Sequence, residues 1–542
     1  MNRREAILSA LLVFGIALVA RVVFASQIVF PKPEDTAYYV GVARNLVEGR
    51  GLVSDALWSF QTPPLIFPRP AFEVWLPLPT YLAALPMAMW GTTFASAQVS
   101  SVLIGAIVPV LAWRLAADVA EERGMSVERA RTLALGTGIT TAFYLPLLLH
   151  SALPDSTMPF AALALAACLL MTRIAAAPLG ARLTGGRVIL LGVLLGLAAL
   201  TRNEAAWLAV VWAILAWRAP MTSRAERSRL IAVVAVVAAL VFAPWAIRDW
   251  REFGSPFPGQ AVANAFSVSG FDIFAWNDPP TLTRYLAVGP ARLVEMRLEG
   301  LSHNLFNVLL LPGLPLSLIG LVALPWQGRG AGLRPLVLLS VITFLVTSLA
   351  FPVATTWGTF LHAAGPVHVL LVIAALLGLD ATIAWVGRRL GWTRPVAWLG
   401  ALLGIFGSVL FSVALLPSFA AGSRGTAERY DALAVRMAEI GHPLDASAGP
   451  VIANFPIWMA ETRRISTLAL PDEPPRDVLD LARTFKARLV VLLDAGSTHW
   501  PVDVDAGVDG AACFRDLGLT PSGDAAMDEA LGGARAFEVV CP

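Results

Sequence analysis

Two adjacent carboxylates, Glu34 and Asp35, stand where the first long apolar stretch of the chain ends, in "FPKPEDTAYY". A carboxylate at such a position can act as a general base that takes a proton from a hydroxyl or an amine. Asp35 is equally suited to cap the helix that follows, because first-turn amides stabilise a carboxylate there. The two roles are compatible, since a capped carboxylate is held rigidly. These residues alone leave both interpretations open.

Two arginines lie at the ends of apolar runs. Arg202 stands in "TRNE" together with Glu204, and Arg248 closes a run in "FAPWAIRDWREF". A charge inside a membrane is costly, so it usually pairs or marks a functional site. Guanidinium groups can bind a phosphate with two hydrogen bonds and stabilise it as it departs. The structural alternatives are an ion pair between Arg202 and Glu204, and an Arg248 side chain that snorkels to the membrane surface.

Several further polar residues lie near the same segments. Asp155 in "HSALPDSTMP" could join a site or cap the next helix, and Glu73 in "RPAFEVW" is ambiguous in the same way. His362 and Trp357 in "TTWGTFLHAAGP" could line a pocket, although a lone histidine is more often solvated. No HExxH, CxxC, Walker or Rossmann pattern is found, which gives ATP-driven or zinc chemistry no support. We therefore predict no metal ligand and no cofactor, with a divalent cation left open.

The composition requires a membrane environment for these groups. The chain has 542 residues, of which 57% are hydrophobic and only 14% charged, whereas a soluble domain has about 25% charged residues. Repeated apolar runs of about 20 residues indicate helical membrane spans. The predicted spans are roughly 6–29, 95–117, 132–150, 158–175, 188–200, 204–217, 230–247, 304–325, 335–352, 366–386 and 396–416. The fold class is thus a polytopic α-helical membrane protein with about 11 spans.

Every alternate connection between these spans is basic, which places it in the cytoplasm by the positive-inside rule. The residues concerned are Arg3, Arg4, Arg123, Arg129, Arg131, Arg173, Arg182, Arg187, Arg218, Arg224, Arg227, Arg229, Arg329, Arg334, Arg388, Arg389 and Arg394. The N-terminus is then cytoplasmic, and the long connections 31–94 and 248–303 lie outside together with the C-terminal tail. The fifth and sixth spans are short, about 20 Å each as helices, and form a re-entrant-like hairpin. Its "TRNE" turn must line a wet, protein-walled cavity.

Two units follow from this division of the chain. Residues 1–419 form the membrane domain with its outer loops, and residues 420–542 form a small extracytoplasmic α/β domain. In that domain "GPVIAN", "ARLVVLLD" and "AFEVVC" are predicted strands, and "PPRDVLDLARTFK" is a predicted helix. Cys513 and Cys541 can form a disulfide if this domain is extracytoplasmic. A juxtamembrane helix over about 35–48 is also predicted, with Arg44, Asn45 and Glu48 on its polar face.

The ordered set of segments resembles the glycosyltransferase C superfamily. The similarity is greatest to bacterial relatives of the dolichyl-phosphate-mannose protein mannosyltransferases and of the lipid A aminoarabinose transferase. The segments that carry it are "EDTAYYVGVARNLVEGRG", "WLPLPTYLAALPMAMWG", "AQVSSVLIGAIVPVLAWRLA", "GLAALTRNEAAWL", "APWAIRDWREFGSPFP" and "GTFLHAAGPVHVLLVIAALLGLD". Together they cover most of residues 6–390.

The resemblance implies roles for particular residues. Asp35 takes the place of the catalytic acid. Glu34 is the alternative, because Thr36 stands between the acidic pair and "AYY" and departs from the spacing that is usual in the family. The resemblance makes Arg202 and Arg248 candidates for binding the donor phosphate. The substrate-binding candidates also include Glu204, Asp155, Tyr38 and His362. Such enzymes typically invert the anomeric centre in one displacement; close relatives need no metal, whereas oligosaccharyltransferase relatives use a divalent cation.

The leading hypothesis is an inverting transferase in the inner or plasma membrane. It would move a sugar from a polyprenyl phosphate to an acceptor lipid, glycan or protein outside the membrane, with no role for nucleic acid. The alternatives are a transporter or flippase for a lipid-linked glycan, because broken spans with charged turns also serve transporters, and a non-catalytic glycan-binding membrane protein.

Overall fold

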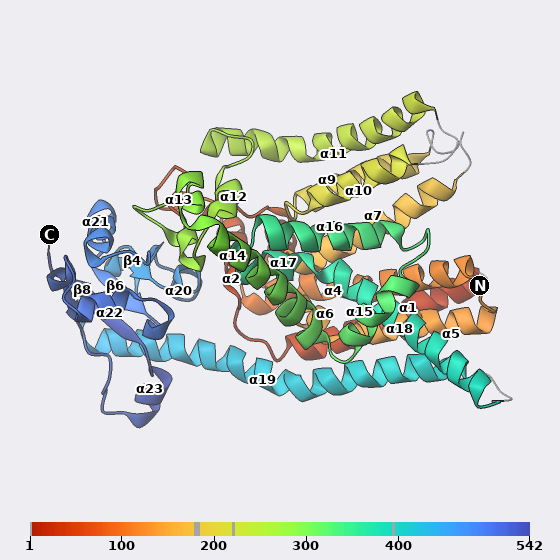
Figure 1. Ribbon diagram of the computed structural model, residues 1–542. Helices are drawn as coiled ribbons and strands as arrows, with labels where there is room; N and C mark the ends of the chain where they lie inside the picture. The colour runs from red at the N-terminus through yellow and green to blue at the C-terminus, as the bar shows by residue number, and fades with distance from the viewer. Residues whose placement is uncertain (1–2, 178–184, 219–222, 393–395, 542) are drawn as a thin grey trace.

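The computed structural model describes residues 3–177, 185–218, 223–392 and 396–541. Arg182 and Arg394 of the basic connections lie outside the described residues. A long helical bundle occupies one end of the molecule and a small α/β domain the other (Figure 1). The described N-terminal helix begins at the far end of the bundle, and the C-terminus lies in the α/β domain.

The bundle consists of apolar helices that match the predicted spans in position. They are α1 (Arg3–Ala25), α4 (Phe94–Glu122), α5 (Val127–Phe143), α6 (Leu145–Ser151), α7 (Thr157–Ala176), α9 (Gly186–Ala199), α10 (Ala205–Trp217), α11 (Arg224–Phe253), α15 (Leu316–Gln327), α16 (Arg334–Ala350), α18 (Gly365–Arg389) and α19 (Ala397–Glu439). The predicted span 304–325 is broken: the charged helix α14 (Gly289–Ser302), from the second outer connection, continues into a π-helix (His303–Leu310), and the helix axis bends by 116° before α15. Among the described residues six are long and apolar enough to cross a membrane, or eight if each of two bent helix pairs counts as one span. The helical membrane fold is confirmed, and the number of spans stays a prediction.

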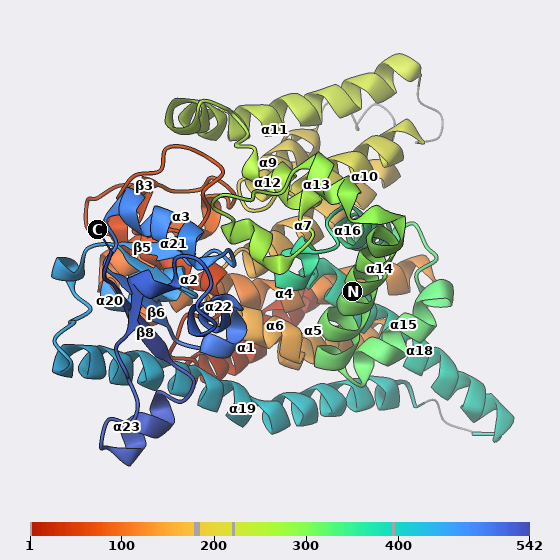
Figure 2. The ribbon, with the colours of Figure 1, turned by 60° about the vertical axis from the view of Figure 1, so that its left-hand side comes forward.

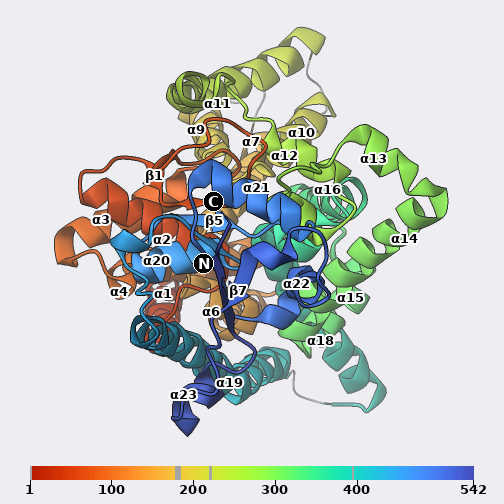
Figure 3. The same cartoon turned by 90° about the vertical axis from the view of Figure 1, so that its left-hand side faces the viewer.

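Helices α9 and α10 form the short pair that the sequence predicts, with Thr201–Glu204 between them. A Cβ on Gly196 would lie 2.6 Å from the Cβ of Val241, so this glycine allows α9 to pack closely on α11. The amide of Leu78 donates a hydrogen bond to the carbonyl of Leu200 (2.9 Å), which ties the end of α9 to the first outer loop. Helices α9, α10 and α11 lie together on the side of the molecule away from α19 (Figures 1 and 3). The turn is thereby held beside the outer loops.

Helix α2 (Glu34–Val47) follows the first span. Pro33 is its N-cap residue and no side chain caps it, so the interpretation of Asp35 as N-cap is wrong; both carboxylates lie in its first turn. The polar face of α2 is also covered rather than open to solvent. Asn45 is buried, and Arg44 forms an ion pair with Glu461 of the α/β domain. Helix α2 is therefore clamped between the bundle and that domain.

The α/β domain is built on a six-stranded sheet in the order β2-β5-β4-β6-β8-β7. Its strands are β2 (Ala56–Leu57), β4 (Val451–Ala453), β5 (Thr467–Ala469), β6 (Leu489–Leu492), β7 (Phe514–Asp516) and β8 (Arg535–Val539), and its helices are α20 (Pro456–Arg463), α21 (Pro475–Phe485), α22 (Trp500–Asp505) and α23 (Ala525–Ala530). The predicted strands and helix of this region are present at the expected positions. The chain passes from residue 419 to residue 420 inside the single helix α19, which runs from the bundle into the domain (Figure 2).

Both outer loops pack against this domain. Strand β2, from the first loop, pairs in parallel with β5, with Ala56 opposite Thr467. The first loop also contains β1 (Val53–Ser54), β3 (Arg69–Pro70) and α3 (Leu78–Trp90), and the second contains α12 (Gln260–Ala263) and α13 (Leu282–Ala287). In the second loop, the amides of Trp276, Asn277 and Asp278 donate to the carboxylate of Glu473. The three polar pieces predicted to share one membrane face are therefore in mutual contact.

A disulfide joins Cys513 and Cys541, which are separated by 28 residues in sequence. Closing a loop of this length restricts the unfolded chain and should stabilise the α/β domain by about 3.6 kcal/mol. We expect Cys513→Ser with Cys541→Ser to lower the Tm of the domain's unfolding transition, measured by intrinsic fluorescence, while the bundle's transition is unchanged. The variant Cys168→Ser, in the buried part of α7, is the matched thiol control. Equal Tm values in reduced and oxidised wild-type protein would contradict this prediction.

Candidate active site

A cavity of about 850 Å³ lies between the outer loops and the bundle. Its polar lining includes side chains from α2, the α9–α10 turn and the segment before α18: Asp35, Tyr39, Thr201, Arg202, Asn203, Glu204 and His362. Glu73 from the first outer loop and Asp249 from α11 also line it. Its apolar lining follows α9, α10 and α11 into the bundle: Leu195, Ala199, Ala209, Trp212, Ile231, Val234, Ala235, Ala238, Ala239 and Phe242. From Ile231 to Phe242 the apolar part runs about 16 Å along α11. The cavity can therefore hold a ligand with a polar head and an apolar tail.

Asp35 extends from the first turn of α2 into the polar part of the cavity. The Nε2 atom of His362 lies 3.3 Å from Asp35 Oδ2, and the Asp35 side chain is 21% exposed. Burial raises the pKa of Asp35, while the positive charges of His362 and Arg202 and a hydrogen bond from Trp75 oppose that rise and the charge of Asp155 adds to it. A carboxylate with a raised pKa is a stronger base. Asp35 thus has the position and the environment of a general base.

Arg202 lies at the turn between α9 and α10. It forms two hydrogen bonds with Glu204, from Nε (3.0 Å) and from one terminal nitrogen (2.7 Å). Its terminal nitrogens also donate to Ser156 Oγ (2.8 Å) and to the carbonyl of Thr359 (3.0 Å). The ion pair that the sequence left as an alternative is therefore present. Because Arg202 and Glu204 also line the cavity, the pair presents an oriented guanidinium to a ligand there.

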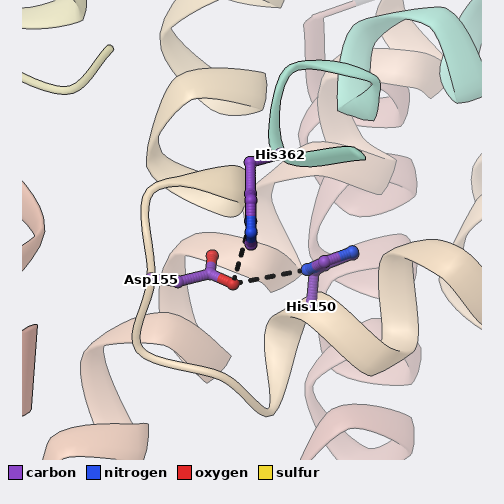
Figure 4. A group of neighbouring side chains, drawn as sticks. All are labelled: His150, Asp155 and His362. Carbon is purple, nitrogen blue, oxygen red and sulfur yellow. Dashed lines mark hydrogen bonds and ion pairs between the residues drawn. The ribbon is translucent and has the colours of Figure 1, made fainter. Parts of the chain in front are cut away.

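Behind Asp35 lies a buried cluster of His150, Asp155 and His362 (Figure 4). Asp155 Oδ2 lies 3.4 Å from His150 Nδ1 and 3.5 Å from His362 Nδ1, and Asp155 Oδ1 accepts from the amide of Thr157 (2.7 Å). Burial opposes ionisation of Asp155, but the hydrogen bonds from both histidines hold its pKa below the usual range. The three donor atoms lie within 4.8 Å of one another, a spacing that would admit a cation. Both carboxylate oxygens of Asp155 already have partners in the protein, so we describe the cluster as a hydrogen-bonded chain.

Besides Asp155, three predicted site residues lie outside the set of described residues that line the cavity. Glu34 faces the α/β domain and its Oε1 accepts from the amide of Ile457 (3.0 Å). Tyr38 is buried, and its hydroxyl accepts from the amide of Phe72 (2.7 Å).

Arg248 is the third of these residues. It donates to the carbonyl of Ala71 (2.7 Å) and stacks on Trp245, with 4.8 Å to the ring centroid. The structure therefore brings Asp35, Arg202, Glu204 and His362 together at the cavity, with Asp155 directly behind His362.

The sequence reasoning overlooked Tyr39, Trp75 and His150. Tyr39 lines the cavity where Tyr38 was expected; on a helix, adjacent residues point about 100° apart, and the motif alone does not say which one faces the site. His150 stands five residues before Asp155 in a connection without lysine or arginine. That spacing is a usable signal for a contact between the two side chains.

Glu34 makes the junction between α2 and the α/β domain sensitive to pH. Burial between α2 and α20 raises the pKa of Glu34 to about 8 from 4.5. Because the folded pKa is the higher one, its contribution to stability is complete below pH 4.5 and is lost as pH rises toward 8. We expect Glu34→Gln, which stays neutral, to flatten the fall in Tm between pH 5 and pH 8. A Tm profile unchanged by Glu34→Gln would contradict this.

Comparisons with known proteins agree with this fold. The sequence matches no protein-family model, and no curated protein matches it. Solved structures do match: the chain shares the fold of the membrane proteins AglB and ArnT, and it is a multi-pass helical membrane protein.

Three similar structures belong to two proteins. The archaeal oligosaccharyltransferase AglB from Archaeoglobus fulgidus, in complex with an inhibitory peptide and a dolichol-phosphate, is 14% identical with a TM-score of 0.54, over 89% of this chain and 69% of that one. ArnT from Cupriavidus metallidurans in the apo state is 13% identical with a TM-score of 0.52, over 98% of this chain and 97% of that one. ArnT bound to undecaprenyl phosphate is 13% identical with a TM-score of 0.52, over 98% of each chain.

Proposed function

We propose that this chain is an inverting glycosyltransferase that moves a sugar from a polyprenyl phosphate to an acceptor outside the membrane. The observation that carries the proposal is one cavity in which a carboxylate, Asp35, and a guanidinium, Arg202, meet an apolar channel along α11. The similar structures of ArnT with undecaprenyl phosphate and of AglB with dolichol-phosphate support a lipid-linked donor. The disulfide in the α/β domain supports its placement in an oxidising, extracytoplasmic compartment.

The lipid tail lies in the apolar part of the cavity, and its phosphate lies at Arg202. Asp35 takes the proton of the acceptor hydroxyl or amine, and the acceptor's electron pair forms the new bond at the anomeric carbon. The bond from that carbon to the phosphate oxygen breaks, and its electron pair leaves with the polyprenyl phosphate. Because the acceptor attacks opposite the leaving group, the anomeric centre inverts. Glu204 orients the guanidinium, which stabilises the charge that develops on the phosphate.

Arg248 has a supporting place in this proposal. Its hydrogen bond to Ala71 and its contact with Trp245 hold the first outer loop against α11. Its neighbour Asp249 forms an ion pair with it (3.0 Å) and lines the cavity. We therefore assign phosphate binding to Arg202 and loop positioning to Arg248.

The test is incubation of the purified protein with a panel of polyprenyl-phosphate sugars and with lipid, glycan and peptide acceptors. Mass spectrometry should detect one polyprenyl phosphate released for each sugar transferred, with the opposite anomeric configuration in the product. Movement of the intact donor across vesicles without release would identify a flippase. Donor binding without either result would identify a non-catalytic binding protein.

A further inference from the structure

His362 occupies a position between two carboxylates from different parts of the chain. Its Nε2 lies 3.3 Å from Asp35 Oδ2 in α2, and its Nδ1 lies 3.5 Å from Asp155 Oδ2 in the connection before α7. The ring is 2% exposed. A Cβ at Gly358, which has φ +120°, would lie 3.3 Å from the Nε2 and Cδ2 atoms of His362. The backbone at Gly358 therefore lies directly against the edge of the ring. The imidazole is therefore fixed in place.

We propose that His362 is a positioning residue, held as an imidazolium between Asp35 and Asp155, that aims the Asp35 carboxylate at the acceptor. This inference rests on the proposed transferase function. In the reaction Asp35 takes the acceptor proton on Oδ1, while the imidazolium keeps both of its N–H groups and stays paired with Oδ2. The acceptor proton later leaves Asp35 for water.

The contacts of the ring admit the doubly protonated form. A neutral imidazole has one N–H donor, whereas an imidazolium has two, and both ring nitrogens here face a carboxylate. The hydrogen bond of Nδ1 is made with Thr157 Oγ1 (2.8 Å). Because a hydroxyl can accept from an N–H group, this contact admits the imidazolium.

The charges around the ring lead to the same conclusion. The charged and titratable groups that face His362 are Asp35 from α2, Asp155, His150 from α6 and Arg202 from the α9–α10 turn. Arg202 is itself paired with Glu204, so the two carboxylates dominate. Burial lowers the pKa of His362, but the charges of Asp35 and Asp155 outweigh burial and raise it above 6.5.

This arrangement defines the pH dependence of transfer. The active form has Asp35 ionised and His362 protonated, so kcat/KM plotted against pH is bell-shaped. Its acidic limb reflects ionisation of Asp35 and its basic limb loss of the His362 proton, and both limbs belong to the coupled pair. In His362→Gln the cation beside Asp35 is lost, and the acidic limb should move up by about 1 to 2 pH units while the basic limb disappears. In Asp155→Asn the imidazolium loses a partner, and the basic limb should move to lower pH. His499→Gln, on the exposed surface of the α/β domain, should leave both limbs in place.

A merely structural role for His362 predicts a lower kcat at every pH with unchanged limbs, and that result would overturn the proposal. Transfer by the wild-type enzyme in the same assay shows that the proposed function stands even then. A second measurement does not need activity: the chain has six histidines, and the imidazole NMR signal absent from His362→Gln belongs to His362. That signal should be mainly that of an imidazolium at pH 6.5 in the wild type and become mainly neutral at the same pH in Asp155→Asn with Asp35→Asn. A neutral His362 at pH 6.5 in the wild type would overturn the proposal.

Discussion

Replacement of Asp35 by asparagine is expected to lower kcat by about 10³-fold, because the acceptor then has no group to take its proton. The side chains have nearly the same shape, and the cavity lined by Arg202 and the apolar helices is unchanged, so donor binding should persist. Turnover is measured as released polyprenyl phosphate and binding as the Kd for the donor. A loss of turnover with a retained Kd assigns Asp35 to the chemical step.

The neighbouring carboxylate provides the matched control. Glu34→Gln keeps an oxygen that accepts from the amide of Ile457, and it replaces a carboxyl whose raised pKa already favours the neutral form. We expect this variant to transfer within a few-fold of the wild-type rate. Wild-type turnover by Asp35→Asn together with inactive Glu34→Gln would exchange the roles of the two residues.

Replacement of Arg202 by glutamine is expected to weaken donor binding and to lower kcat/KM by about 10² to 10³-fold, because the departing phosphate loses its cation. The same change leaves Glu204 unpaired in a largely buried position, which itself destabilises the turn. Measured Tm and kcat/KM therefore have to be compared in the same variant.

The double variant Arg202→Gln with Glu204→Gln separates the two effects. It removes the ion pair as a unit and leaves no buried unpaired charge, so the Tm should return toward the wild-type value. If Arg202 binds the phosphate, kcat/KM stays low in the double variant. Recovery of kcat/KM together with the Tm would show that Arg202 serves only as the partner of Glu204.

The membrane fold was predictable because bilayer thickness sets the length of an apolar helix and basic connections set its orientation. These local signals located the helices of the bundle, the short α9–α10 pair and the elements of the α/β domain. They also predicted Asp35 and Arg202 on one membrane face, and in the structure both side chains line one cavity.

The contacts between distant segments could not be predicted in this way. The pairing of Ala56 with Thr467 in the sheet involves a strand of two residues, which has no recognisable periodicity. The contact of His362 with Asp35 and Asp155 joins three connections, and a lone histidine in a sequence carries no information about its partners. The choice of Tyr39 over Tyr38 as the cavity residue depends on how α2 is rotated against α3 and α20, which tertiary packing decides.

Strand β2 also has a consequence for how the chain is synthesised. Ala56 and Leu57 leave the ribosome early, but their partner strand β5 begins only at Thr467, near the end of the chain. At roughly 5–20 residues per second, the segment waits on the order of half a minute with its backbone groups unpaired. The sheet edge is therefore completed only after all described helices of the bundle have been made, and in a nascent chain stalled before that point β2 has no partner strand.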